Sequence, residues 1–202
     1  MRCATLAVVY YLAAGSTPVL AQDGPNTLGA YFDAEGLIDC AYPVPNMIFD
    51  LYWILTNAAA DALIEYEFAW AYDPEITPEP LVIQCTLPPG VLSEPTAHNL
   101  IVGLAFGYPT SDVTVLAHLR MLSFSPLPDL AYITVGPATP PSIPGHASIL
   151  YVGATEPVPL AFAGAGEVDD QGWSVPGVAQ INASCTTPVA AHAWGAVKAL
   201  FR

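Results

Sequence analysis

Apolar and polar residues alternate with a period of two along much of the chain, most clearly in residues 47–55 and 62–72. A short polar segment, residues 56–61, joins these two runs. Successive side chains of a strand point to opposite faces, so each run has one apolar face: Phe49, Leu51, Trp53 and Leu55 in the first, and Tyr66, Phe68, Trp70 and Tyr72 in the second. The pattern predicts two strands that pair as a central antiparallel hairpin with one face buried.

Shorter runs of the same kind follow at intervals that are typical of a β-sandwich. Twenty-one prolines and fifteen glycines punctuate the chain and leave little room for long helices. We therefore predict an all-β protein, a single antiparallel β-sandwich of the immunoglobulin-like jelly-roll kind with about ten strands. The expected strands outside the hairpin are residues 28–33, 81–87, 99–106, 113–124, 130–135, 147–152, 158–163 and 175–182, and residues 107–112 are expected to form a hairpin-like connection.

The N-terminal end differs from this strand-rich part. Residues 1–21 have the features of a secretory signal peptide, because Arg2 precedes an apolar stretch and Val19-Leu20-Ala21 fits a small-residue cleavage site. Residues 22–185 then form the expected β-sandwich domain. We expect the protein to be secreted or to reach the cell surface, and no later stretch resembles a transmembrane segment.

Residues 186–202 form a tail in which the strand pattern stops and a short amphipathic helix is expected. Trp194, Val197 and Phe201 share one face of that helix, and Trp194 and Phe201 are candidate binding residues. A helix this short is marginal in water alone. Three interpretations stay open: the helix packs on the sandwich, sorting machinery or an assembly partner recognises it, or the tail is disordered.

Net charge limits the choice of partner. The chain has eighteen acidic residues and four basic residues, which gives a formal net charge of −14. Such a surface repels the phosphate backbone of nucleic acids and anionic membrane surfaces. We therefore expect no nucleic-acid partner.

The cysteines predict one disulfide bond. Cleavage of the signal peptide removes Cys3 and leaves three cysteines in an exported protein, where disulfides persist. Cys40 and Cys185 each follow a predicted strand, and the first and last strands of many sandwiches are neighbours, so Cys40–Cys185 is the preferred bridge. Cys40–Cys85 is the alternative. Cys85 is otherwise expected on the apolar face of strand 81–87, where a free cysteine behaves as a small hydrophobic residue.

Motifs for catalysis or metal binding are missing from the sequence. Glu65 and Glu67 share one strand face, so they do not flank a substrate as a glycosidase pair would, and we expect both to be solvated. The four histidines have no partner at metal-ligand or triad spacing. There is no Gly-x-Ser-x-Gly elbow and no phosphate-binding glycine loop. We expect no enzyme activity and no resident metal or cofactor, with one calcium hypothesis left open.

That hypothesis concerns the loop Glu167–Trp173, which could hold calcium through Asp169 and Asp170 or offer Trp173 to a ligand. The alternative is a solvated acidic turn, because the loop lacks the Asp-x-Asp-x-Asp-Gly ladder of a helix-loop calcium site. The aromatic stripe of residues 66–72 could stack on sugar rings. Aromatic residues dominate buried area, however, so we expect the stripe to be core.

The order of segments resembles the cohesin-type β-sandwich of bacterial surface and polysaccharide-degrading systems. Tyr31-Phe32-Asp33 is similar to the opening strand of that sandwich. Residues 64–74, which end in Tyr-Asp-Pro, are similar to one of its inner strands, and residues 113–124 are similar to a later core strand. Residues 193–202 resemble the closing segment of uncharacterised exported bacterial proteins. The resemblance implies a non-catalytic module for attachment or adhesion between proteins. The alternative is a carbohydrate-binding module of a polysaccharide-degrading system. The expected partner is accordingly a protein or a polysaccharide at the cell surface.

Overall fold

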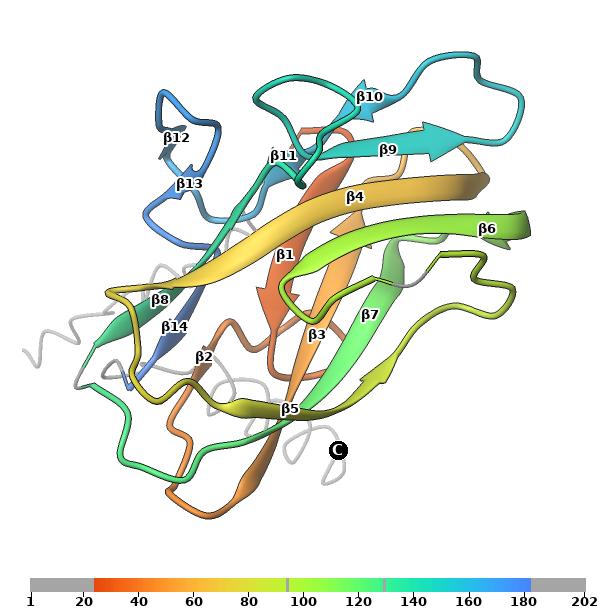
Figure 1. Cartoon of the computed structure of the whole chain (residues 1–202). Helices are drawn as coiled ribbons and strands as arrows, with labels where there is room; N and C mark the ends of the chain where they lie inside the picture. The colour runs from red at the N-terminus through yellow and green to blue at the C-terminus, as the bar shows by residue number, and fades with distance from the viewer. Residues whose placement is uncertain (1–23, 94, 129, 183–202) are drawn as a thin grey trace, which may run out of the picture.

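A computed structural model describes residues 24–93, 95–128 and 130–182, and these residues form an all-β protein without a helix (Figure 1). The described residues therefore contain no helix that could cross a membrane. The predicted signal peptide 1–21 and the tail 186–202 lie outside the described residues. The strands are β1 (Thr27–Tyr31), β2 (Cys40–Ala41), β3 (Ile48–Thr56), β4 (Ala62–Asp73), β5 (Leu81–Thr86), β6 (Asn99–Pro109), β7 (Val113–Leu122), β8 (Ala131–Gly136), β9 (Ser148–Tyr151), β10 (Val158–Pro159), β11 (Ala161–Phe162), β12 (Glu167–Val168), β13 (Ser174–Val175) and β14 (Ala179–Ile181).

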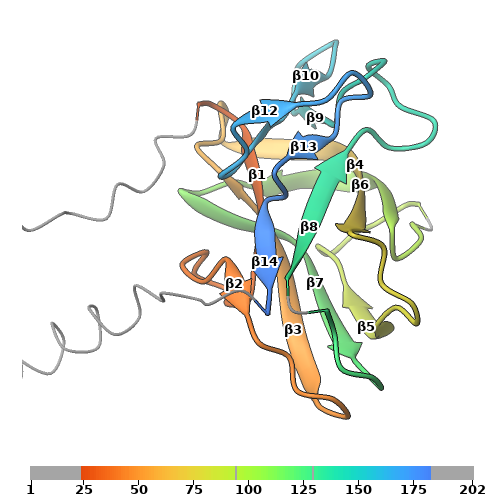
Figure 2. The same ribbon diagram turned by 90° about the vertical axis from the view of Figure 1, so that its left-hand side faces the viewer.

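Two large sheets pack against each other, which confirms the predicted β-sandwich (Figures 1 and 2). Sheet A has the strand order β11-β1-β3-β7-β5. Sheet B has the order β10-β9-β4-β8-β14-β2, and β6 also pairs with β4. Strands β12 and β13 form a separate two-stranded hairpin. The pairing is antiparallel except for β1 with β11 and β14 with β2.

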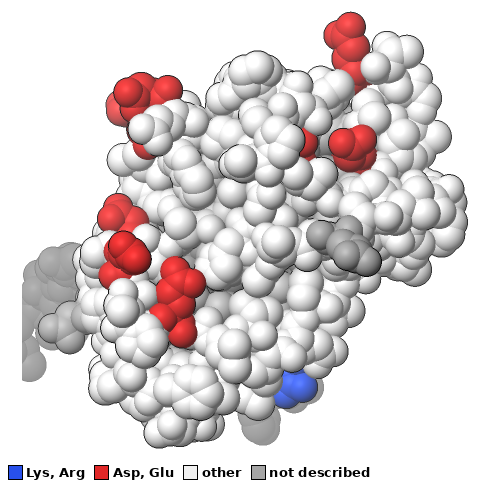
Figure 3. Space-filling model, viewed as in Figure 1, with Lys and Arg blue, Asp and Glu red and all other residues white. Residues whose placement is uncertain are grey.

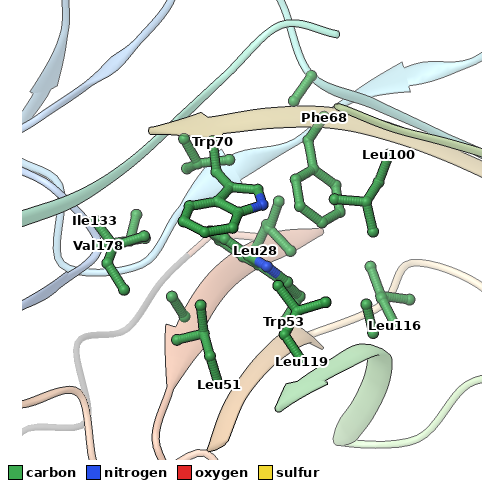
Figure 4. Packing of buried hydrophobic residues seen from close by; sticks show 14 of the residues in the cluster. Leu28, Leu51, Trp53, Phe68, Trp70, Leu100, Leu116, Leu119, Ile133 and Val178 are labelled. Atoms are coloured by element: carbon green, nitrogen blue, oxygen red, sulfur yellow. The ribbon is translucent and has the colours of Figure 1, made fainter. Parts of the chain in front are cut away.

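The inward faces of β3 and β4 are those predicted from the alternation. Trp53, Phe68 and Trp70 are buried at the centre of the core, with the Trp53 ring centroid 4.9 Å from Phe68 and 5.9 Å from Trp70 (Figure 4). Tyr66 and Tyr72 are buried beside them, so the aromatic stripe is core, as expected. Because its rings are buried between the two sheets, this stripe cannot stack on a sugar.

The predicted central hairpin is wrong, because β3 and β4 belong to different sheets. Strand β3 pairs with β1 and β7, whereas β4 pairs with β6, β8 and β9. Residues 57–61 cross between the sheets, and Asn26 holds the crossing through its N–H to Asn57 O and its Oδ1, which accepts from Ala59 N. Two bulky apolar faces fill more core volume when they oppose each other across a sandwich than when they lie side by side, and the period of two does not distinguish these cases.

Residues 107–112, expected to connect a hairpin, also cross between the sheets. Strand β6 lies in sheet B and β7 in sheet A. The two crossings touch, because Thr110 N donates to Asp61 O at 2.9 Å. Predicted strand 158–163 likewise divides, so that β10 pairs with β9 and β11 with β1, with the polypeptide switching sheets after Pro159. Such switches explain why the structure has more and shorter strands than predicted.

The phase predicted for strand 81–87 is wrong. Strand β5 is the edge of sheet A, and its register with β7 shifts between Val82 and Gln84. Leu81 is 52% exposed and Ile83 is 42% exposed, while Val82 packs against the core. The bulge breaks the alternation, and an edge strand has only one neighbour to cover it.

Candidate functional site

The outer face of sheet A carries a row of rings across three neighbouring strands. In the strand register, Tyr31 of β1 lies opposite Tyr52 of β3, and Tyr52 lies opposite His118 of β7. The Tyr52 and His118 rings are stacked, with centroids 4.3 Å apart and planes within 3°. The Tyr31 ring lies over Gly29, where a Cβ would come within 2.5 Å of the ring, so a side chain at residue 29 would displace the ring from this position.

A charged pair of strand neighbours lies beside the ring row. Asp50 of β3 is opposite Arg120 of β7, and each is two residues from a ring residue, on the same face. His118 Nε2 lies 2.7 Å from Asp50 Oδ1, and Arg120 Nε lies 3.7 Å from the same oxygen. We call Tyr31, Asp50, Tyr52, His118 and Arg120 the Tyr52 patch.

The electrostatic surroundings of this patch are mostly negative. Arg120 is the one Lys or Arg in the described part of the chain, which contains fifteen of the eighteen acidic residues. The pKa of Tyr52 is raised, chiefly by burial and further by the negative charges of Asp50, Glu35 and Asp33. Tyr52 therefore keeps its phenolic proton at neutral pH and can donate a hydrogen bond. Figure 3 shows scattered acidic groups, one basic group and much uncharged surface on one side of the molecule.

The ion pairs of the patch contribute little to stability, because the Asp50 and Arg120 side chains are 40% and 43% exposed. Their effect is to fix side-chain positions. Stacking on Tyr52 and contact with Asp50 hold His118 in place, and the Asp50 carboxylate also lies near Arg120. The result is an open, ordered surface with rings and charges ready to contact a partner.

The three candidate binding residues of the Glu167–Trp173 loop have different surroundings. Asp169 Oδ1 accepts hydrogen bonds from Gln171 N at 2.9 Å and from Trp173 N at 2.8 Å. The Trp173 ring covers Gly136, where a Cβ would lie 2.5 Å from Cδ2 of the ring. Asp170 is exposed.

The described residues contain no group of three or more His, Cys, Asp or Glu side chains that could hold a metal ion. Among these residues, nothing supports the calcium interpretation of the loop. Ligand binding by Trp173 stays a prediction. The other two candidate binding residues, Trp194 and Phe201, lie outside the described residues.

The expectation that Glu67 is solvated is wrong. Its side chain is buried, and the carboxylate accepts hydrogen bonds from Ser142 N at 2.6 Å, Ser142 Oγ at 2.9 Å and Ser148 Oγ at 2.9 Å. The loop between β8 and β9 covers this position. Glu65, on the same strand face, is only partly buried. The two carboxylates therefore have different environments.

The state of Cys85 excludes one of the two predicted disulfide pairings. Cys85 is a free, exposed residue, so Cys40–Cys85 is wrong. Cys40 is disulfide-bonded. Cys185 lies outside the described residues, so Cys40–Cys185 stays a prediction. Asn182, three residues before Cys185, donates its N–H to Ala41 O at 2.8 Å, which brings the chain within reach of Cys40.

A second polar cluster lies near Trp70, toward the C-terminal end of β4. His98 Nε2 is 3.3 Å from Glu79 Oε2, and the His98 ring stacks on Trp70 with centroids 4.3 Å apart. Trp70 Nε1 donates to Ala97 O at 2.6 Å. These contacts fasten the loop before β6 onto the core, so we assign the cluster a structural role.

Sequence reasoning did not single out any member of the Tyr52 patch as a site residue. The patch forms only when β1, β3 and β7 are paired in one register, and the sequence places these strands far apart. One available signal was Arg120, the single basic residue between residues 3 and 197. A lone cation on a predicted strand of an acidic protein marks an unusual position.

No protein-family model matches the chain, and no curated protein matches it at a significant level. Among solved structures, the chain is similar to a cohesin module from a family 33 glycoside hydrolase of Clostridium perfringens. The sequence identity is 10%, the alignment covers 68% of this chain and 98% of that module, and the TM-score is 0.35. We transfer no residue role from this structure.

Proposed function

We propose that the chain is an exported, non-catalytic interaction module that binds a protein partner through the Tyr52 patch. The observation that carries the proposal is the row of Tyr31, Tyr52 and His118 beside Asp50 and Arg120 on the open face of sheet A. Tyrosine and arginine are the residue types that most often dominate binding energy at protein interfaces. Here neighbouring side chains order them in advance, which lowers the entropic cost of binding.

The charge of the module indicates the chemistry of the partner. Asp33, Glu35 and Asp50 lie close enough to Tyr52 to raise its pKa, and the whole chain has a net charge of −14. A partner surface with apolar groups opposite the rings and basic groups around them would complement this patch. Complementary charge would also speed association, and the rate would fall as salt is added.

The ring geometry supports a protein over a polysaccharide. Tyr52 and His118 are cross-strand neighbours whose planes are nearly parallel at 4.3 Å, so one ring lies alongside the other across the strands. Each of these two rings therefore covers one face of the other. Sugar platforms need an exposed ring face. The other stripe that could have stacked on sugars, residues 66–72, is in the core.

Hydrogen bonding around His118 supports a binding role over a catalytic one. Its Nε2 contacts Asp50, and the neighbouring hydroxyl, Thr86 Oγ1, accepts from Gln84 Nε2 at 3.3 Å. A nucleophile–histidine–carboxylate relay needs the hydroxyl bonded to the histidine. No such bond is present among the described residues.

The test uses the immobilised full chain against surface and secreted proteins of the producing organism and against a panel of polysaccharides. Each ligand that binds is purified, and its affinity is measured by surface plasmon resonance. We expect a protein ligand whose affinity falls about tenfold or more with Tyr52→Ala and with Arg120→Ala. Phe106→Ala is the matched control, because Phe106 is an exposed aromatic residue on β6 of the other sheet.

Two results would contradict the proposal. In one, every bound protein keeps its affinity in Tyr52→Ala and Arg120→Ala. In the other, a polysaccharide binds and the same two substitutions abolish that binding, which would favour a carbohydrate-binding module. Circular dichroism spectra of the variants would establish that the substitutions leave the fold unchanged.

A further inference from the structure

One end of the outer face of sheet A is apolar. Ile48 of β3, Leu122 of β7 and Leu81 of β5 are successive cross-strand neighbours on this face. Met47 precedes Ile48, and Phe124 follows β7 by two residues. Four of these five side chains are 46–58% exposed, and Leu122 is partly buried. We call these five residues the apolar end.

The loops around the apolar end bring its residues together. Asn46 N donates to Ser123 O at 2.6 Å, so the segment before β3 lies against the segment after β7. Met47 and Phe124 are the next residues on either side of this bond. Single exposed apolar residues need no explanation, but a contiguous group of this kind marks a surface that something covers.

The described chain ends near this surface. Asn182 donates its N–H to Ala41 O, and its Nδ2 donates to Leu127 O at 3.1 Å and Pro128 O at 2.8 Å. Leu127 is three residues beyond Phe124, so their Cα atoms are at most about 11 Å apart. The described chain therefore ends, at Asn182, within reach of Phe124.

The composition of residues 183–202 complements the apolar end and the acidic domain around it. This segment contains Trp194, Val197 and Phe201, two basic residues and no acidic residue. The described residues hold one basic residue and fifteen acidic ones. Opposite charges therefore attract the segment to the domain. Two whole domains carry the same negative charge and repel each other, so a second copy of the sandwich is disfavoured as the occupant of the apolar end.

We propose that the apolar end is the docking surface for the chain's own C-terminal segment, residues 188–202. The apolar side chains of this segment contact Ile48, Leu81 and Phe124, and Lys198 and Arg202 lie near acidic groups of the domain. Twelve residues from Asn182 to Trp194 span up to about 40 Å, which is ample for this reach. The inference goes beyond the proposed function and does not depend on a bound partner, because the apolar end shares no residue with the Tyr52 patch.

A disulfide-trapping experiment tests the contact directly. In a Cys85→Ser background, Leu81→Cys is combined with Val197→Cys in the full chain. The matched control combines Phe106→Cys with Val197→Cys, because Phe106 is similarly exposed but lies on sheet B. We expect the first pair to oxidise to an intramolecular disulfide at least about tenfold faster than the control, as peptide mapping of the monomer would measure.

Mixed isotope-labelled and unlabelled protein identifies the source of the segment. Disulfides within one chain support the proposal, whereas disulfides between a labelled and an unlabelled chain would overturn it in favour of exchange between copies. Equal oxidation rates for the Leu81 and Phe106 positions would also overturn it.

Hydrogen exchange gives an independent measurement without cysteine substitutions. A chain that ends at residue 187 keeps Cys185 and loses only the proposed docking segment. We expect faster exchange at residues 47–49, 81–83 and 122–124 in this shortened chain, with no change in β6 or β9. Unchanged exchange at the apolar end would contradict the proposal. Partner binding is absent from both experiments, so their failure would leave the test of the Tyr52 patch unaffected.

Discussion

Removal of the Glu67 carboxylate is expected to be among the most damaging single changes on the outer face of sheet B. Glu67 is 1% exposed and lies opposite Ser148 in the β4–β9 register. Its two oxygens accept three hydrogen bonds, two from Ser142 and one from Ser148. The carboxylate thus joins β4, β9 and the loop between β8 and β9.

The expected magnitude comes from these three bonds. A hydrogen bond to a charged group contributes about 1.5–3 kcal/mol, and an unpaired buried donor costs about 1–3 kcal/mol. In Glu67→Ala the Ser142 N–H loses its acceptor, while the two hydroxyl groups can rotate toward other acceptors. Removal of a buried charge that has no cation partner among the described residues offsets part of the loss. We therefore expect Glu67→Ala to lower the free energy of unfolding by about 3 kcal/mol.

Two further variants separate the hydrogen bonds from the charge and from the strand position. Glu67→Gln keeps the shape and one carbonyl acceptor, and its amide can donate to Ser142 Oγ, so we expect a loss of about 1–2 kcal/mol. Glu65→Ala removes a carboxylate from the same strand face but from a partly buried site, and should cost less than about 0.5 kcal/mol.

Urea unfolding followed by circular dichroism measures all three free energies, and hydrogen exchange at the Ser142 amide reports on the loop itself. The reasoning predicts the order Glu67→Ala, then Glu67→Gln, then Glu65→Ala, with faster exchange at Ser142 in the first. Equal losses for Glu67→Ala and Glu65→Ala would refute it. So would a Ser142 amide whose exchange is the same in all variants.

Three other predictions concern the core, the thiol and the tyrosines. Trp53→Ala should lower the free energy of unfolding by about 3–5 kcal/mol, and Trp53→Phe by clearly less in the same urea assay, because Trp53 Nε1 is buried without a hydrogen-bond partner in the described structure. Without reductant, iodoacetamide should modify Cys85 and leave Cys40 unmodified. Because burial raises the pKa of the Cys85 thiol, the pH midpoint of the Cys85 reaction should lie above about 8.5, the ordinary pKa of a free thiol. Burial also raises the pKa of Tyr66 and Tyr72, so above about pH 10 the unfolded chain loses these protons first and stability should fall; absorbance at 295 nm that reports complete tyrosine ionisation before the circular dichroism signal changes would contradict this.

The alternation of residues predicts which side chains enter the core but not which strands pair. Trp53, Phe68 and Trp70 face inward as the pattern indicates, because burial of large aromatic side chains dominates the stability of a sandwich. The same alternation is compatible with a hairpin or with two facing sheets. The choice depends on the connection at residues 57–61 and on strands that come much later in the chain, so local periodicity does not determine it.

Glu67 illustrates a second limit of sequence reasoning. A carboxylate at an outward position of a strand is normally solvated, and the sequence around Glu67 contains no sign of burial. The donors that satisfy it come from Ser142 and Ser148, about 75 and 81 residues further along the chain. Only the folded loop between β8 and β9 reveals them, which is also why Glu65 and Glu67, two residues apart, differ so strongly.

The outer faces of the two sheets differ in a way that bears on function. Loops cover two positions on the outer face of sheet B: the loop that contains Ser142 buries Glu67, and the β12–β13 hairpin places Trp173 over Gly136. On the outer face of sheet A, the side chains of Asp50 and Arg120 are 40–43% exposed. A sandwich gains stability from covering its sheets, so a partly exposed group of rings with the single described basic residue is better explained by contact with a partner than by folding alone. For this reason we propose sheet A as the binding face, even though no local motif in β1, β3 or β7 indicates it.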